Sequence, residues 1–550
     1  MKKFTLLAYS AVLSVLLYAQ APPYQWARQG GGPFNGEVSN AIYVDASGNS
    51  YITGTFFDTC RFGSITLLGG SLNPAWYTDV FVAKYDASGN PLWAKSGTSP
   101  VDDGGFAVCA DNSGNVYVAG YFNRYNNSAI TFGSLAPLAS VGWDDIFLVK
   151  YDANGNEQWA VKAGGSQNDY AYDLVADNNG NVYMVGNCQA TCTFGTNSVS
   201  SSGWGDVYVA KYNASNGNNI WTVKAGGSGN DEGYGIEMDA SGNLYITGFF
   251  TGTCTFGSAG ALTSSGFTDA FVAKLDNNGN FLWAKKGGGA ATDAGTAITL
   301  DPLGNVYITG YVDGNATFGT ISLTSGGAFD LFAAKYDNSG NVLWAVNDGG
   351  IGNDKAYGIC RDNQGGIYVT GSYEQTATFG TYPMTVQGIS DVFTTKYDPS
   401  NGNNLWALSG GAEDQDIAFG IGVDNSDKLY ITGAFRLQAF FGSALNASAF
   451  DEIFLVKIDN VLSVEDMEAN NHYVQLFPNP ASALATLSID PAFFTRNAWY
   501  DITDVAGKVV QTEQLGDVSS SVDLSALPAG MYLLKVNTEN GAAVKQIIKQ

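Results

Sequence analysis

The stretch DVFVAKYDASGNPLWAK (residues 79–95) decides the fold of this chain. A β-branched and aromatic run leads into the turn ASGN, and a second apolar run carries Trp93. Two such runs separated by a Gly/Asn turn predict a β-hairpin. The stretch returns along the chain in variants such as DIFLVKYD, DVYVAKYN and DLFAAKYD. It is therefore one piece of a repeated structural unit.

A tryptophan marks the period of the repeat. Successive copies are 61 to 67 residues apart: Trp26, Trp93, Trp159, Trp221, Trp283, Trp344 and Trp406. Each period holds four strand-like runs, here named a, b, c and d, with the Trp in run d. Units of this length and content are typical of β-propeller blades. A parallel solenoid is the alternative, although its coils usually need shorter periods.

The two ends of the array complement each other. The array starts with a Trp run that lacks runs a to c, and it ends at Asp459 with a run c that lacks its Trp. We predict an all-β, seven-bladed β-propeller over residues 22–460, in which the N-terminal strand pairs with run c near residues 452–459. This closure would remove two free sheet edges.

The repeat resembles the SBBP family of bacterial β-propeller repeats through GNVYITGY (304–311), the TFG segments and DVFVAKYDASGNPLWA. The resemblance extends over roughly residues 24–459. It implies the propeller architecture, and it transfers no single activity.

Charge and targeting limit the partners. Asp and Glu number 51 against 26 Lys and Arg, a formal net charge of -25. Phosphates would be repelled, so we expect no nucleic-acid partner, whereas cations and neutral sugars remain candidates. Residues 1–21, MKKFTLLAYSAVLSVLLYAQA, predict a secretory signal peptide. No later run is long and apolar enough for a transmembrane segment, so we expect a secreted protein.

The period stops after residue 460. Residues 461–472 are polar and acidic and predict a linker, and residues 473–550 predict a small C-terminal β-sandwich. This segment resembles the type A C-terminal sorting domain of the type IX secretion system through LFPNP (476–480), DVAGKVV (504–510), DLSALPAGMYLLKV (523–536) and KQIIK (545–549). The resemblance implies a Bacteroidetes-type bacterium, the type IX secretion machinery as partner, and a secreted or outer-surface location. The motif residues that carry it are Pro478, Asn479, Pro480, Gly507, Gly530 and Tyr532.

Two sets of acids follow the repeat. One set begins run a: Glu37, Asp103, Asp169, Asp231, Asp293, Asp354 and Asp416. The other begins run c: Asp79, Asp145, Asp206, Asp269, Asp330, Asp391 and Glu452. Runs a and c of an antiparallel blade point the same way, so both sets should lie on one face, with the run-a set around the mouth of a central channel. They either cap loop backbone or form a site for cations, of which Ca²⁺ is the candidate cofactor.

Departures from the repeat are the better indications of a ligand. Loops between runs b and c carry Trp76, Trp143 and Trp204, which either stack on sugar rings or pack against neighbouring loops. Cys188 and Cys192 are candidates for a disulfide, because export permits one and no His or second Cys pair supports a metal site.

Composition leaves catalysis without a clear site. The only His, His472, lies outside the repeat, so a Ser-His-Asp or Cys-His arrangement is excluded within it. No P-loop or dinucleotide fingerprint is present. We therefore expect a binding or adhesion protein without catalysis, with a glycan or cell-surface partner. The alternatives are a polysaccharide hydrolase or lyase that uses acids at the channel mouth, and a structural surface component.

Overall fold

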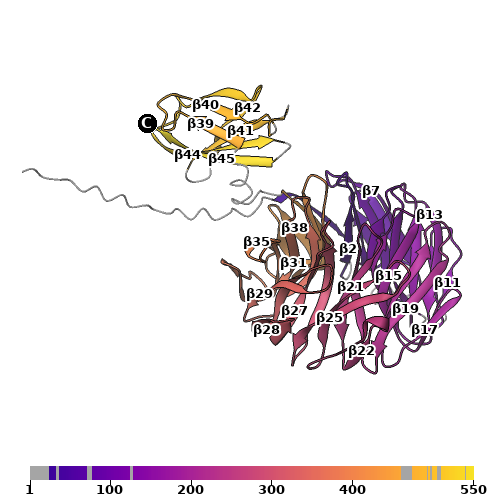
Figure 1. Cartoon of the computed structure of the whole chain (residues 1–550). Helices are drawn as coiled ribbons and strands as arrows, with labels where there is room; N and C mark the ends of the chain where they lie inside the picture. Colours follow the sequence, from indigo (N-terminus) through magenta and orange to yellow (C-terminus); the bar gives the residue numbers. More distant parts are fainter. Residues whose placement is uncertain are drawn as a thin grey trace, which may run out of the picture. The chain divides into compact units, whose positions relative to one another are not determined.

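The computed structural model describes residues 24–32, 36–70, 77–123, 128–459, 473–491, 493–495, 498–504, 509–538 and 541–550. Its contacts divide the chain into two compact units, Ala21–Asn460 and one containing Val461–Gln550. Both units are built from β-strands (Figure 1). In these ranges we find no helix of the length and hydropathy that a membrane span requires.

The first unit consists of antiparallel four-strand sets that follow runs a, b, c and d. The a strands are β2 (Val38–Val44), β8 (Asp103–Ala110), β14 (Asp169–Ala176), β20 (Glu232–Met238), β26 (Ala294–Leu300), β30 (Lys355–Arg361) and β36 (Asp416–Val423). The b strands are β3 (Ser50–Phe56), β9 (Val116–Asn123), β15 (Asn181–Cys188), β21 (Leu244–Phe250), β27 (Val306–Phe318), β31 (Ile367–Tyr373) and β37 (Leu429–Phe440).

Each b strand pairs with a c strand, and each c strand pairs with a d strand. The c strands are β6 (Asp79–Tyr85), β12 (Asp144–Tyr151), β18 (Asp206–Asn213), β24 (Asp269–Leu275), β28 (Ile321–Tyr336), β34 (Asp391–Tyr397) and β38 (Ala444–Ile458). The d strands are β7 (Pro91–Thr98), β13 (Glu157–Gly164), β19 (Asn219–Gly227), β25 (Phe281–Gly289), β29 (Val342–Gly350), β35 (Asn404–Gly410) and β1 (Tyr24–Gly31). Six d strands follow their own c strand in the chain. β1 instead comes from the N-terminus and pairs antiparallel with β38, with Trp26 opposite Lys457.

A further hairpin lies in each b–c connection and is not among the four predicted runs. It pairs with the d strand of the preceding set, as Phe132 does with Gly97, and so widens most sheets to six strands. The separate hairpins are β4 (Thr59–Phe62) with β5 (Ile65–Leu68), β10 (Ala129–Phe132) with β11 (Leu138–Ala139), β16 (Thr191–Phe194) with β17 (Asn197–Ser200), β22 (Thr253–Thr255) with β23 (Ala261–Thr263) around the 3-10 turn η2 (Gly257–Ala259), and β32 (Thr376–Phe379) with β33 (Tyr382–Thr385). In the other two repeats the hairpin is continuous with β27 and β28 or with β37 and β38.

The turn ASGN of the quoted stretch is fastened by its own aspartate. Asp86 Oδ1 accepts hydrogen bonds from the backbone N–H groups of Ser88, at 2.9 Å, and Asn90, at 2.8 Å. Gly89 takes the left-handed conformation at φ +77°, which favours glycine. The acidic turn is therefore a hairpin device.

Neighbouring sets are joined through the d-strand tryptophans. The Trp93 indole N–H donates to the carbonyl of Ala153 in the next set, at 3.2 Å, and a Cβ placed on Gly155 would lie 2.8 Å from the ring. Trp26 makes the equivalent contact with Gly89, where a Cβ would lie 3.0 Å from its ring. β1 thus packs against the first repeat as each other d strand packs against the repeat after it.

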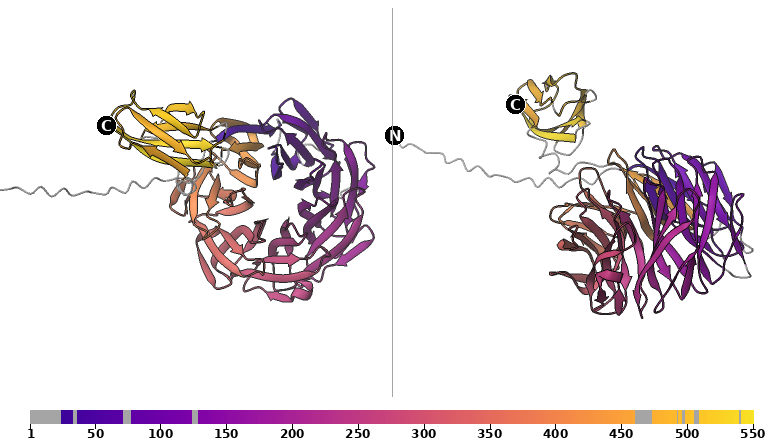
Figure 2. Two further views of the ribbon diagram at one scale, coloured as in Figure 1. Left: turned by 45° about the horizontal axis from the view of Figure 1, so that its top comes forward. Right: turned by 45° about the vertical axis from the view of Figure 1, so that its right-hand side comes forward.

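The a strands form the inner wall of the first unit. Their contacts run in cyclic order from β2 through β8, β14, β20, β26 and β30 to β36, and β36 contacts β2 again. Figure 2 shows the sheets arranged around a central opening. The buried apolar core lies between neighbouring sheets, as in the cluster that joins Val118 and Tyr151 to Val80.

The second unit contains two antiparallel sheets around a core of its own. One sheet has the order β39 (Val474–Phe477), β40 (Leu484–Ile489), β43 (Ser519–Asp523). The other has the order β42 (Val509–Gln514), β41 (Trp499–Asp504), β44 (Gly530–Thr538), β45 (Gly541–Lys549).

Candidate functional site

The acids that begin the a strands are buried rather than exposed. All seven have side chains without measurable exposure: Glu37, Asp103, Asp169, Asp231, Asp293, Asp354 and Asp416. Asp231 shows the arrangement: its Oδ2 accepts from the N–H of Gly227 at 2.9 Å, and its Oδ1 accepts from the N–H of Thr251 at 3.1 Å. Burial raises the pKa of Asp231 to about 6. The same pair of backbone donors, four residues before and twenty after, serves Asp169, Asp293, Asp354 and Asp416.

These surroundings bear on the predicted Ca²⁺ site. Calcium takes six to eight oxygen ligands, whereas the groups that contact these five carboxylates are N–H donors. Among the described residues, no group donates a hydrogen bond of ordinary length and angle to the carboxylate oxygens of Glu37 or Asp103. Burial raises the pKa of Glu37 to about 9. Backbone N–H groups suit a carboxylate that fastens two loops, and they are not ligands for Ca²⁺. Binding of Ca²⁺ by the seven acids stays a prediction.

The acids that begin the c strands are also buried. Asp269 Oδ2 accepts from the N–H of Ser265 at 3.1 Å and lies 3.3 Å from Lys286 Nζ. Asp391 and Asp330 accept from the backbone N–H four residues before them in the same way. This set holds the end of each b–c loop.

Exposed apolar side chains surround the face on which these loops lie. They stand two residues before the c-strand acid in five of the seven repeats, and the other two repeats have Tyr77 and Ala328 there. We call these five the rim residues: Trp143, Trp204, Phe267, Ile389 and Phe450. Their exposed fractions are 67%, 81%, 74%, 61% and 42%. The backbone beneath them is tied to the adjoining d–a loop, since Trp204 N–H donates to Gly229 O at 3.1 Å and Ile389 N–H donates to Asp414 O at 2.9 Å. Two of the three predicted tryptophans, Trp143 and Trp204, belong to this set, and Trp76 lies outside the described residues.

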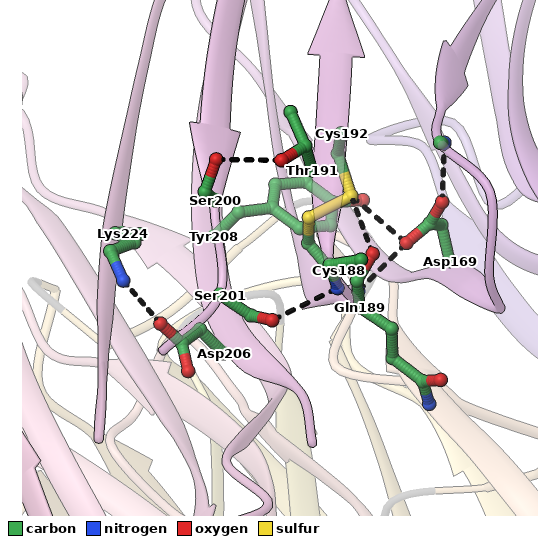
Figure 3. Close-up of a disulfide and its surroundings, with 12 residues drawn as sticks. Asp169, Cys188, Gln189, Thr191, Cys192, Ser200, Ser201, Asp206, Tyr208 and Lys224 are labelled. Atoms are coloured by element: carbon green, nitrogen blue, oxygen red, sulfur yellow. Dashed lines mark hydrogen bonds and ion pairs between the residues drawn. A yellow bond between two sulfur atoms is a disulfide. The ribbon is translucent and has the colours of Figure 1, made fainter. Parts of the chain in front are cut away.

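Cys188 and Cys192 form a disulfide. Cys188 ends β15 where the equivalent strands carry Phe56, Phe122 or Phe250, so the pair fills the space of an aromatic ring. Figure 3 shows Asp169 beside it, with Cys192 Sγ 2.9 Å from Asp169 Oδ1. Among the described residues, these three side chains are the one group close enough together to share a metal ion, and the disulfide removes both thiolates from such a role.

Sequence reasoning did not find the central cavity. A β-bulge interrupts every a strand three residues after its acid, as between Ala171 and Asp173 in β14. The bulged residues form a collar around a cavity of about 300 Å³, which Tyr311 also lines. The collar residues are Asn40, Phe106, Tyr172, Tyr234, Thr296, Tyr357 and Phe419. The constant spacing from the a-strand acid was the available signal.

The collar rings contact one another in two arcs. Phe106 stacks on Tyr172 with centroids 5.7 Å apart, and Tyr172 meets Tyr234 edge-on at 5.0 Å. Tyr357 and Phe419 form the second arc at 5.3 Å. The smaller side chains separate the arcs: Asn40 Nδ2 donates to Gly105 O at 2.9 Å, and Thr296 Oγ1 donates to Ala356 O at 2.8 Å.

A second cavity, of about 460 Å³, shares the seven collar residues, and two carboxylates that break the repeat line it. Asp173 stands where every other a strand has alanine or glycine, and Glu237 stands where every other has an uncharged residue. Asp173 Oδ2 accepts from the Ile236 N–H at 2.8 Å, and Glu237 Oε1 accepts from the Met238 N–H at 3.0 Å. Burial raises the pKa of both carboxyls to about 7, and the charge of Glu237 adds to the shift of Asp173.

The motif residues of the second unit hold its last strand. Asn479 Oδ1 accepts from the Ile548 N–H at 2.9 Å, next to Pro478 and Pro480. Tyr532 is buried in the core, two residues after Gly530 begins β44, and its hydroxyl donates to Pro528 O at 3.0 Å. Gly507 lies outside the described residues.

Family models match both parts of the chain. Residues 158–188 match the β-propeller repeat SBBP, and residues 475–550 match the secretion system C-terminal sorting domain. The chain carries an SBBP β-propeller repeat and a type IX sorting domain. Both resemblances inferred from the sequence are thus confirmed. The sorting domain directs export by the type IX secretion system to the cell surface or the extracellular space.

Two longer proteins match this chain over about a third of their own length. An uncharacterised WD repeat-containing protein of Acanthamoeba polyphaga mimivirus is 27% identical over 481 residues, covering 74% of this chain and 33% of that protein. The regulatory protein FlaEY of Caulobacter vibrioides is 28% identical over 311 residues, covering 52% of this chain and 32% of that protein. The chain thus spans about a third of either relative. The solved WD40 β-propeller domain of Doa1 is 8% identical, with a TM-score of 0.40 over 80% of this chain and 98% of that one.

Proposed function

We propose that this protein is a non-catalytic binding protein outside the cell, built as a seven-bladed propeller that β1 closes. The cyclic contacts of the a strands and the pairing of β1 with β38 support the closed ring. The match of residues 158–188 to the propeller repeat supports the assignment of the four-strand sets as blades.

The rim residues carry the proposal of binding. Single exposed apolar side chains are ordinary on soluble proteins, whereas several of them gathered on one face indicate a binding surface. Here Trp143, Trp204 and Phe267 occur at one position of three successive repeats, each more than 60% exposed. Their loops are tied down by backbone hydrogen bonds, so the rings are presented without a large ordering cost on binding.

A neutral glycan is the partner that this rim suits. Aromatic faces stack on the apolar faces of sugar rings, and successive sugars of a chain can use rings of successive repeats. The formal net charge of -25 disfavours an acidic polysaccharide. A glycan at the surface of the producing cell or of a neighbouring cell fits the exported location.

The test compares polysaccharide binding by the wild-type protein and the variant Trp143→Ala/Trp204→Ala/Phe267→Ala, with Ca²⁺ and with EDTA. Leu303→Ala is the matched control, because Leu303 is 82% exposed but lies in an a–b turn, on the other face. We expect the triple variant to lose at least tenfold in affinity for a neutral glycan and the control to bind as wild type. Equal binding by the triple variant contradicts the proposal.

Catalysis is tested on the same samples. The predicted acids of the hydrolase or lyase alternative are all buried, and five of the seven are bonded to backbone N–H groups, so they do not reach a polysaccharide on the rim. Accumulation of new reducing ends or unsaturated sugars with a neutral or acidic polysaccharide would overturn the non-catalytic function. Constant chain length supports it.

A further inference from the structure

The central cavity combines aromatic walls with negative charge. Five of the seven collar residues are aromatic, and Asp173 and Glu237 line the same cavity of about 460 Å³ as these rings. A third acid, Glu232, lies beside the hydroxyls of Tyr172 and Tyr234 and raises the pKa of both, in addition to the effect of burial. Aromatic faces and carboxylates together are the chemistry that recognises an organic cation.

We propose that the central cavity binds the ammonium group of an alkylamine, with the collar rings around its alkyl chain and Asp173 and Glu237 as its counter-ions. The site is distinct from the rim, and it does not depend on glycan binding there.

The protein already holds primary ammonium groups in this way. Lys355 Nζ lies 4.7 Å from the ring centre of Tyr311, which lines the adjoining cavity of about 300 Å³, and 4.0 Å from that of Phe329. In the repeats, Lys84 Nζ lies 4.9 Å from Tyr51, and Lys274 Nζ lies 4.8 Å from Tyr245. Lys355 shows that an ammonium group is accommodated against the aromatic wall.

Several other ionisable groups face the site. Lys355, from β30, contacts the ring of Tyr311 and interacts electrostatically with Glu374. The described residues that line the two cavities include no Lys or Arg. Cys109 and Tyr43 line the cavity from β8 and β2, and burial raises the pKa of both, to about 12 for Tyr43. They stay neutral near pH 7. Asp111 also lines the cavity, and its Oδ2 accepts hydrogen bonds from Asn115 Nδ2, at 2.8 Å, and from the Tyr117 hydroxyl, at 2.9 Å.

The raised pKa of Asp173 and Glu237, about 7 for each, makes the proposal measurable. An alkylammonium group stays charged from pH 5.5 to 8. The two carboxyls are largely protonated at pH 5.5 and largely ionised at pH 8, so affinity should rise at least tenfold between these values. At pH 7 the bound cation should drive ionisation of both groups, and protons should be released.

The experiment is calorimetric titration of the full chain with cadaverine in 0.15 M NaCl, which screens non-specific attraction to the acidic surface. The uncharged isostere 1,5-pentanediol is the ligand control. We expect saturable one-to-one binding of cadaverine, none of the diol, and a heat at pH 7 that changes between phosphate and Tris buffers because protons are released.

Three variants separate the site from the rest of the molecule. Asp173→Asn/Glu237→Gln should weaken cadaverine binding at least tenfold and abolish its pH dependence. Tyr357→Leu keeps both carboxyls and should weaken binding several-fold. Glu413→Gln/Asp517→Asn makes the same charge change at two exposed positions outside the cavity and should stay within twofold of wild type.

Circular dichroism and thermal melting confirm that each variant is folded. If one of the first two variants does not fold, the cadaverine affinity of the other still tests the proposal. Binding of the diol as tightly as cadaverine, equal affinity at pH 5.5 and 8, or unchanged affinity in a folded variant of the first two overturns the proposal.

Discussion

Asp231 and Glu237 lie six residues apart, one just before β20 and one within it, yet they do different work. Asp231 recurs in every repeat, is fully buried and binds two loop N–H groups. Glu237 occurs in one repeat only, lines the central cavity and accepts one hydrogen bond. The acid that recurs fastens two loops of its repeat, whereas the acid that breaks the repeat lines the cavity.

The strongest test of the repeated part is the closing strand. Deletion of residues 22–30 removes most of β1, so β38 loses its partner and Trp26 leaves the turn at Gly89. We expect the melting temperature of the first unit to fall by on the order of 10 °C or more. Deletion of residues 461–469 is the control of equal length and should leave that transition in place. An unchanged melting temperature after the first deletion would mean that the ring is not closed by β1.

The two acids themselves give the next largest effect. In Asp231→Asn the amide can accept from only one of the Gly227 and Thr251 N–H groups, so one buried donor is left unpaired, at a cost of about 1–3 kcal/mol. In Glu237→Gln the amide oxygen keeps the single bond to Met238, so the unfolding free energy should change by about 1 kcal/mol or less. Urea unfolding followed by tryptophan fluorescence measures both. Equal losses would remove the distinction between the two kinds of acid.

The disulfide is a departure from the repeat whose effect should be smaller. Closing a loop as short as Cys188–Cys192 stabilises by roughly 2 kcal/mol. Cys188→Ser/Cys192→Ser should lose about that amount. Cys188→Phe/Cys192→Ala restores the residue types of the other repeats and should recover part of it. No recovery would show that the site has adapted to the disulfide and no longer accepts the aromatic ring.

Periodicity made much of the fold predictable. Apolar alternation, the Gly/Asn turns and the Trp spacing predict runs a to d, because the same pattern returns in every repeat. The N-terminal Trp run without runs a to c, and the last run c without a Trp run, predict where β1 pairs. The b–c hairpins were missed because they pair with the preceding set: Thr59–Phe62 finds its partner in β1, far away in the chain. Short segments whose pairing partner belongs to another repeat carry little signal of their own.

The sequence did not predict the cavity, because β-bulges change the side of the strand on which its two acids lie. Simple alternation places Asp173 and Glu237 on the same side of their strands as the buried acids Asp169 and Asp231. The extra residue at Tyr172 and at Tyr234 reverses that alternation, and both carboxylates line the cavity. The sequence shows the aromatic residue at a constant spacing, but it does not show that the backbone bulges there.

Dependence on pH separates the two groups of acids once more. Burial raises the pKa of Asp231 and Asp293 to about 6 and of Asp354 and Asp416 to about 7, against about 3.9 in an unfolded chain. The folded state therefore binds more protons than the unfolded state between these values. The stability this provides is complete below pH 4 and is lost as the pH rises to about 7.

We thus expect the melting temperature to be lower at pH 8 than at pH 5, by about 2–4 °C for each kcal/mol of unfolding free energy that is lost. Exposed turn acids such as Asp152, whose pKa is lowered by its hydrogen bond from Asn156, titrate below this window. Asp231→Asn and Asp173→Asn/Glu237→Gln should each flatten the slope, because each removes carboxyls with a raised pKa. Only the second should also remove the pH dependence of cadaverine binding. A melting temperature that rises from pH 5 to pH 8 would show that the hydrogen bonds to these carboxylates outweigh their burial.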